Sequence, residues 1–243
     1  MAAARARKRH VQQELFRRGG KRRGAGRPPK GARAGTTHQV RPEIDERYPL
    51  HVTLRLVPEV GNMRRTNMYK AVRDASVTVA MRERIRIVHA SVQTNHIHLL
   101  IEATNKEALT SGMQGFQISL ARLVNTALST STGRRRKGRV FADRYHVVEI
   151  RSPRQARNVL SYVLSNWRKH REDLSAPTTW LLDPFSSAIS FPDWLEREGD
   201  DWMWRIPPDH DPVIVFRPKS WLLREGWKRA GTVSARSVPS SQH

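Results

Sequence analysis

Two histidines separated by a single residue, His96 and His98, are the first candidates for chemistry in this sequence. They lie in the run NHIHLLIEA (95–103), whose β-branched and alternating apolar residues predict a strand. Alternate residues of a strand point to one face, so both imidazoles face the same way, opposite Ile97 and Leu99. Two imidazoles side by side on a rigid element could bind a divalent cation. The alternative is a pair of histidines that only pack and form hydrogen bonds.

A tyrosine and an amide form the second candidate pair. Tyr162 and Asn166 lie in LSYVLSN (160–166), within a helix that is predicted to begin with Ser152 as N-cap and Pro153 at its first position and to end near residue 170. Four helical residues turn by 400°, so the two side chains lie about 40° apart around the axis. They flank an apolar stripe, where a tyrosine could serve as a nucleophile and an amide as a ligand. A surface tyrosine with a polar neighbour is the alternative.

The elements that must position these residues follow a regular order. The hydrophobic patterns predict strands at 48–56, 84–92, 95–103 and 143–150, and helices at 64–80, 107–128 and 152–170. The order β-α-β-β-α-β-α indicates an α+β fold, a ferredoxin-like antiparallel sheet with helices packed on one face.

This core occupies the middle of the chain. Residues 1–44 are rich in Arg, Lys, Gly and Pro and predict a disordered basic arm, followed by a domain at 45–172. Residues 173–243 hold six of the seven tryptophans and predict an irregular extension that docks on the domain.

The formal net charge is +22, and both the arm and the predicted domain are basic. A polyanion, most simply nucleic acid, is therefore the expected partner. Arg27 lies in RGAGRPPKG (23–31), which partly resembles the AT-hook that binds the DNA minor groove. The loop after the second helix could contact the DNA backbone or be a solvated run of charge, and it contains Arg134, Arg135, Arg136 and Lys137.

Composition also excludes several classes of protein. The chain has no cysteine, so disulfides, zinc–thiolate sites and a thiol nucleophile are excluded. The basic N-terminus has no apolar segment behind it, and no stretch is long and apolar enough to span a bilayer. We therefore expect no membrane partner, and a cytoplasmic, nucleoid-associated protein.

Several segments together resemble one known family. TNHIHLLIEA resembles the Asn-His-hydrophobic-His block of the single-tyrosine HUH transposases, in particular the REP-associated tyrosine transposases. HVTLR (51–55) resembles their opening strand, GRVFADRYH (138–146) the segment before their last helix, and Tyr162 and Asn166 their Tyr-x-x-x-Asn motif. The resemblance covers about residues 48–171. The family commonly continues with Asn-Pro-Val, whereas Trp167 follows Asn166 here.

The resemblance implies an HUH endonuclease fold and a DNA strand transferase. It implies that His96, His98 and Asn166 bind Mg²⁺ or Mn²⁺, and that Tyr162 attacks single-stranded DNA at hairpin-flanked sites. The products would be a 5′-phosphotyrosine and a free 3′-hydroxyl. His51 lies in the resembling segment HVTLR and His146 in GRVFADRYH. Both histidines are therefore expected on the substrate side. The expected partner is single-stranded or hairpin DNA, bound by a monomer or a homodimer.

Rival interpretations explain less of the sequence. HVT at 51–53 matches half of the paired His-x-Thr/Ser signature of 2H phosphoesterases, but HIH at 96–98 does not supply the second half. A HIT-type nucleotide hydrolase needs a third alternating histidine, where this chain has Leu100. A domesticated derivative that binds hairpin DNA without cutting it remains the alternative to an active transposase.

Overall fold

An antiparallel sheet of four strands lies at the centre of the fold. The structure is a computed structural model that describes residues 42–177, 180–197 and 210–239. The strands pair in the order β2-β3-β1-β4, and their bounds are β1 Leu50–Arg55, β2 Ile85–Val92, β3 His96–Ala103 and β4 His146–Glu149. The predicted α+β fold and order of elements are confirmed. Arg27 and the rest of the predicted arm up to residue 41 lie outside the described residues.

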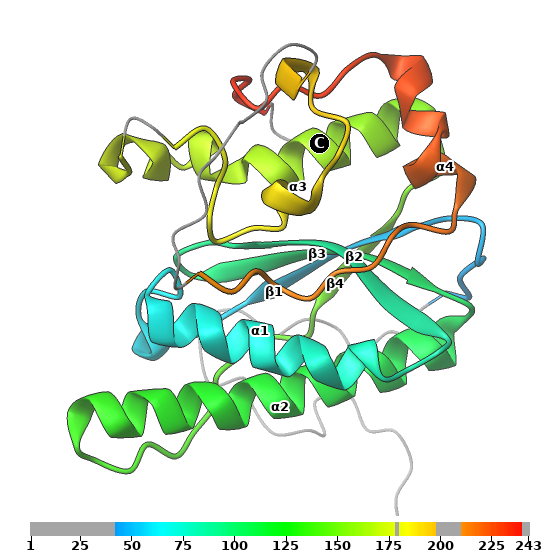
Figure 1. The fold of residues 1–243 in the computed structure, drawn as a ribbon. Helices are drawn as coiled ribbons and strands as arrows, with labels where there is room; N and C mark the ends of the chain where they lie inside the picture. Colours follow the sequence, from blue (N-terminus) through cyan, green and yellow to red (C-terminus); the bar gives the residue numbers. More distant parts are fainter. Residues whose placement is uncertain (1–41, 178–179, 198–209, 240–243) are drawn as a thin grey trace, which may run out of the picture. The chain divides into compact units, whose positions relative to one another are not determined.

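Two long helices cover one face of the sheet (Figure 1). They are α1, Thr66–Ala80, and α2, Lys106–Thr132. Alternate residues of the central strands, such as Val52 on β1 and Leu99 on β3, pack against the helices in one apolar core. This arrangement matches the ferredoxin-like expectation and leaves the opposite face of β1 and β3 for other residues.

Local chemistry explains where α2 begins and how closely it packs. The side chain of Asn105 accepts a hydrogen bond from the backbone N–H of Ala108 at 2.9 Å, which caps the first turn. Gly133 follows the last turn with φ 66°, a left-handed conformation that glycine adopts without strain. A side chain at Gly112 would lie 2.5 Å from Ile85, so glycine allows α2 to approach β2 closely.

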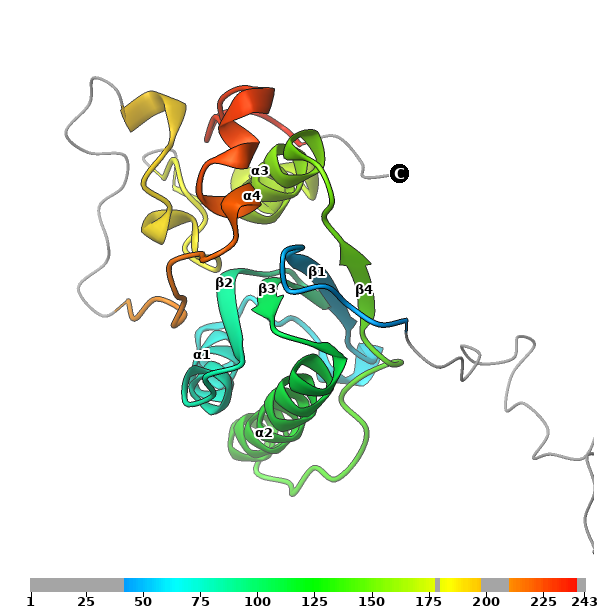
Figure 2. The ribbon, with the colours of Figure 1, turned by 90° about the vertical axis from the view of Figure 1, so that its right-hand side faces the viewer.

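The third helix lies on the opposite face of the sheet. Figure 2 shows α3, Pro153–Lys169, across the sheet from α1 and α2, beside the short helix α4, Trp221–Arg224. The prediction that the helices pack on one face is therefore correct for α1 and α2 and wrong for α3. β3 is buried along almost its whole length, and on its second face Leu100 packs in one cluster with residues of α3.

The C-terminal extension completes this second core. Described residues from 182 to 235, among them Trp194 and Trp227, pack with α3 in a single cluster. The extension also covers the outer edge of β2 with two backbone hydrogen bonds. The N–H of Val92 on β2 donates to the backbone oxygen of Phe185 at 2.8 Å, and the N–H of Phe216 donates to the backbone oxygen of Ile87 on β2 at 2.9 Å. The predicted docking of an irregular extension matches this packing. Trp202 and Trp204 lie outside the described residues.

No helix in the described ranges combines the length and the apolar character needed to cross a membrane.

Candidate active site

Three histidines and one tyrosine meet where β3 begins. His96 and His98 lie on β3 with ring centres 4.7 Å apart, and the ring of Tyr162 on α3 lies 5.1 Å from that of His98. His51 on β1 is stacked on His98 at 5.1 Å and lies 6.0 Å from Tyr162. The structure thus brings together the predicted histidine pair, the predicted nucleophile and one of the two histidines expected on the substrate side.

The pairing of β1 with β3 explains how His98 is oriented. Thr53 lies directly opposite His98, and directly opposed residues share a face, as do residues two apart on one strand, so His51 and Thr53 face the same side as His98. Nδ1 of His98 lies 3.0 Å from Nε2 of His51 and 3.2 Å from Oγ1 of Thr53. Nε2 of His98 is buried without a hydrogen-bond partner in the described structure, so this nitrogen is available to a ligand.

His96 is held in a similar way. Its Nδ1 lies 2.7 Å from Oδ1 of Asn95, an acceptor, so Nδ1 carries the hydrogen and Nε2 keeps its lone pair. Burial, with a smaller contribution from the nearby His170, lowers the pKa of His96 to about 4. Burial and the neighbouring His51 hold the pKa of His98 well below 6.5. Both imidazoles are therefore neutral near pH 7, the state that a metal ligand requires.

The predicted N-terminus of α3 is present, but the helix is not regular at the site. Oγ of Ser152 accepts a hydrogen bond from the backbone N–H of Gln155 at 3.2 Å, and Pro153 follows as the first helical residue. Ser165 departs from helical geometry with φ −118° and ψ 19°, between Tyr162 and Asn166. The calculated 40° separation of these two side chains therefore does not apply.

Tyr162 and Asn166 differ in their exposure. Tyr162 is half-buried, and burial raises the pKa of its phenol, while the neighbouring amide of Asn166 opposes that shift. Asn166 is fully buried, and within the described structure neither atom of its amide has a partner of good hydrogen-bond geometry. Buried polar groups are normally paired, so an amide and a histidine nitrogen without partners indicate a place for an external ligand.

Two residues at the end of α3 join the site without having been predicted. The Nζ of Lys169 lies 4.7 Å from the centre of the Tyr162 ring, and the ring of His170 lies 5.3 Å from that of His96. His170 follows Asn166 by four residues, a spacing that places two residues on one face of a helix. This spacing is the sequence signal from which His170 could have been predicted at the site.

His146 lies beside the site, whereas the predicted basic loop does not. His146 is exposed at the start of β4 directly opposite Thr53, so it shares that face of the sheet with His51 and His98. Arg134, Arg135 and Lys137 are exposed in the loop after α2, a helix on the face of the sheet opposite α3 (Figure 1). Arg136 has a structural contact, because its guanidinium donates to Oδ1 of Asn125 and, at 3.0 Å, to the backbone oxygen of Arg139.

The remaining tyrosines are not placed to act with the histidine pair. Tyr69 is buried in the core under α1 and α2, where its hydroxyl accepts a hydrogen bond from the backbone N–H of Val213 at 3.1 Å. Tyr145 is buried in the same core. Tyr48 packs against the second core and lines a cavity at the other end of β3.

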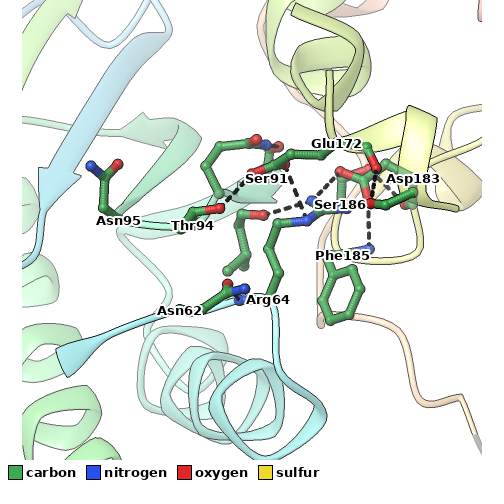
Figure 3. Close-up of polar contacts among 12 residues, drawn as sticks. Asn62, Arg64, Ser91, Thr94, Asn95, Glu172, Asp183, Phe185 and Ser186 are labelled. Atoms are coloured by element: carbon green, nitrogen blue, oxygen red, sulfur yellow. Dashed lines mark hydrogen bonds and ion pairs between the residues drawn. The ribbon is translucent and has the colours of Figure 1, made fainter. Parts of the chain in front are cut away.

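A charged cluster holds the end of α3 near the start of β3 (Figure 3). The guanidinium of Arg64 contacts Asp183 at 2.9 Å and Glu172, just after α3, at 3.1 Å. Glu172 also accepts a hydrogen bond at 2.6 Å from Thr94, two residues before His96. This cluster ties α3, the extension and the β2–β3 turn together, and thereby fixes Tyr162 relative to the histidines.

The donor atoms suit a divalent cation. Among the described residues no group of three or more His, Cys, Asp or Glu side chains is placed to hold a metal ion. The predicted set is of another kind, two imidazoles and one amide oxygen. Nε2 of His98 and the amide of Asn166 are buried and have no partner of good hydrogen-bond geometry in the described structure. Amide oxygen suits both Mg²⁺ and Mn²⁺, and imidazole nitrogen suits Mn²⁺ better than Mg²⁺.

Residues 50–166 match the family model described as "Transposase IS200 like". Residues 50–166, just under half of the chain, are therefore similar to the IS200-like transposases. The match begins at the first residue of β1 and ends at Asn166, so it includes both histidines, Tyr162 and the amide. A transposase of this family cleaves and rejoins DNA, which fits the basic charge of the chain.

Two solved structures resemble the fold. One, titled as a REP-associated tyrosine transposase bound to a REP hairpin, is 16% identical with a TM-score of 0.49, and the alignment covers 76% of this chain and 100% of the other. The second, a transposase from Deinococcus radiodurans R1 by its title, is 14% identical with a TM-score of 0.34, covering 60% and 100%. No curated protein sequence matches the chain. The likeness to transposases rests on the family model.

Proposed function

We propose that this protein is an IS200-like transposase of the REP-associated type. It would be a metal-dependent single-stranded DNA endonuclease and strand transferase that acts at hairpin-flanked sites through a phosphotyrosine. The observation that carries the proposal is the position of Tyr162, whose ring lies 5.1 Å from that of His98. His98 in turn offers a buried nitrogen without a partner. A nucleophile and a pair of neutral imidazoles therefore face one space.

His96, His98 and Asn166 would hold Mg²⁺ or Mn²⁺. The bound ion would supply Lewis-acid polarisation of the scissile phosphate. The neutral state of both histidines, produced by burial, keeps their nitrogen lone pairs available at neutral pH. Asn95 and His51 hold the Nδ1 atoms of these two histidines, so each can present Nε2 to the same space.

Tyr162 would perform the covalent step. Its phenolic oxygen attacks the phosphorus, the bond to the 3′ oxygen breaks, and that oxygen leaves as the 3′-hydroxyl after taking up a proton. The 5′ phosphate stays on Tyr162. Because the phosphodiester bond is exchanged for a phosphotyrosine bond of comparable energy, rejoining needs no nucleotide cofactor.

The charge of Lys169 supports this step. Tyrosine has an ordinary pKa near 10, and burial raises the pKa of Tyr162 further, so the phenolate needs stabilisation. Lys169 places a positive charge 4.7 Å from the centre of that ring, where it can attract both the phenolate and the DNA phosphate.

Labelled single-stranded hairpins from the sequences flanking the gene test the proposal. Incubation with Mg²⁺ or Mn²⁺ should give a covalent protein–DNA species that survives denaturing electrophoresis, and EDTA should abolish it. His96→Ala and His98→Ala should lose the adduct and retain hairpin binding, whereas Ile118→Ala, at an exposed position of α2 on the other side of the sheet, should form it. Tight hairpin binding without any adduct would instead support the domesticated, non-cleaving alternative.

A further inference from the structure

A second concave site lies at the other end of the sheet. A cavity of about 590 Å³ is lined by residues at the end of β3, including Glu102, and by Pro153 at the start of α3. His96 and His98 lie at the beginning of β3. With a rise of about 3.3 Å per residue, Glu102 is roughly 13 Å along the strand from His98, on the same face. The cavity is thus distinct from the candidate active site.

The cavity contains two cations that are free of ion pairs. Its lining includes five cationic side chains, those of Arg47, Arg84, Arg86, Arg151 and Lys219, and three carboxylates, those of Glu46, Glu83 and Glu102. In the described structure Arg47, Arg86 and Arg151 form ion pairs with Asp45, Glu102 and Glu149, whereas Arg84 and Lys219 form none. Glu102 is buried, and its carboxylate already accepts the backbone N–H groups of Lys219 and Ser220, both at 2.8 Å. The cavity therefore favours an anionic ligand.

An exposed tryptophan at this cavity is held in a fixed position. Trp221 is 48% exposed and forms part of the lining of the cavity. The guanidinium of Arg229 lies 4.9 Å from its ring centre, and a side chain at Gly226 would come within 2.8 Å of the ring. The contact between Glu102 and the backbone of Lys219 and Ser220 fixes the residues just before it. Trp221 is therefore a preorganised aromatic surface.

An aromatic surface beside a basic lining is the chemistry that binds single-stranded nucleic acid, because any base can stack on the ring while the cations hold the phosphates. The volume also lies within the range of about 300–1,000 Å³ that is usual for ligand sites. We infer that this cavity binds an unpaired nucleotide of the DNA substrate, with its base on Trp221 and its phosphate near Arg84 and Lys219. The inference rests on the proposed function, since it assigns a second contact to the same single-stranded substrate.

Binding measurements in EDTA test the cavity without any cleavage. We expect Trp221→Ala to weaken the binding of a labelled single-stranded oligonucleotide about five- to 150-fold in fluorescence anisotropy, the range found for the loss of one stacked base. Trp221→Phe should retain most of the affinity, and duplex of the same sequence should bind both variants as it binds the wild type. Phe216→Ala removes another exposed aromatic of the extension and should change nothing.

A scan with abasic sites identifies the nucleotide. One or two positions should weaken binding to the wild type and have no further effect on Trp221→Ala, because the two changes remove the same contact. Unchanged affinity in Trp221→Ala, or an equal loss for single strand and duplex, would overturn the inference. Absence of the Tyr162 adduct would defeat the proposed function alone, because the binding assay does not depend on cleavage.

Discussion

His51, which is expected on the substrate side from the sequence, contacts His98 in the structure. It is buried, and its Nε2 lies 3.0 Å from Nδ1 of His98. If Nε2 of His98 binds a metal ion, its Nδ1 carries the hydrogen and donates to His51. His51 would then be a positioning residue that fixes the tautomer and the orientation of a metal ligand, a role that such outer contacts commonly have.

Replacing His51 should therefore act on the metal. We expect His51→Ala to lower the affinity for Mn²⁺ about 10- to 100-fold, the usual effect of losing such a contact. The measurement is titration of free Mn²⁺ by electron paramagnetic resonance, which does not depend on DNA cleavage. Ile118→Ala is the control, because Ile118 is exposed on α2, on the other side of the sheet from the candidate metal ligands. Equal Mn²⁺ affinities for the wild type and His51→Ala would contradict the assigned role.

The sequence alone could identify some of these residues and not others. The spacing of His96 and His98 predicts a shared face because a strand alternates with period two. The contact with His51 depends on the register between β1 and β3, which no local pattern encodes. His170 was overlooked although it follows Asn166 by four residues, because the chain departs from the family pattern just after that position.

At the scale of elements, the contacts of Arg64 join α3 to the sheet. Asp183 is completely buried and Arg64 is 10% exposed, so each charge depends on the other. Removing one partner of a buried pair leaves the second charge desolvated. This cluster therefore fixes the geometry of the active site as well as the stability of the fold.

We expect Asp183→Ala to destabilise the protein by about 3–5 kcal/mol, the range observed when one partner of a buried ion pair is removed. Urea unfolding at pH 7 measures this change. Asp45→Ala is the control, since Asp45 forms an exposed ion pair with Arg47 and its loss should have little effect. Similar unfolding midpoints for the two variants would contradict a structural role for the cluster.

β2 contributes a buried histidine that links stability to pH. His89 lies near Ser187, with Nδ1 3.1 Å from its Oγ, and burial lowers the pKa of His89 to about 4. The unfolded chain binds this proton near pH 6.5 and the folded chain only near pH 4. The stabilisation is therefore complete above pH 6.5 and is lost as the pH falls toward 4.

The contribution of His89 should amount to about 3 kcal/mol between pH 6.5 and pH 4. Urea unfolding at a series of pH values should show wild-type stability declining over this range, more steeply than that of His89→Gln, which lacks this group. His96 and His98 shift in the same direction and should leave a smaller decline in the variant. Parallel pH profiles for the two proteins would show that His89 does not titrate in this way.

The arrangement of the elements was predictable on one side of the sheet only. Helical periodicity and capping residues predicted α1, α2 and α3, and α2 is longer than expected, at Lys106–Thr132. The position of α3 on the opposite face was not predicted, because that face of β3 carries the polar residues His96, His98 and Glu102, which give no signal of burial under a helix. The register shift in β2 between Ile87 and His89 and the irregular docking of the extension also carry no periodic signal.

At the scale of the whole molecule, positive charge should govern affinity for DNA. Each phosphate neutralised on a single strand contributes about −0.7 to the slope of log K against log salt. Deleting the basic residues 1–44 should flatten this slope and weaken binding to unrelated sequences. Fluorescence anisotropy from 50 to 300 mM salt, roughly the range over which such effects are large, measures both. An unchanged slope would mean that these residues do not contact DNA.

The identity of the nucleophile tests the account most directly. The transposase is allowed to react with a labelled single-stranded hairpin and Mn²⁺, and the adduct is digested and analysed by mass spectrometry. The nucleotide should be attached to the peptide containing Tyr162, and Tyr162→Phe should form no adduct while its unfolding midpoint stays close to that of the wild type. An adduct on Tyr145, or one that persists in Tyr162→Phe, would contradict the assignment of α3 to the active site.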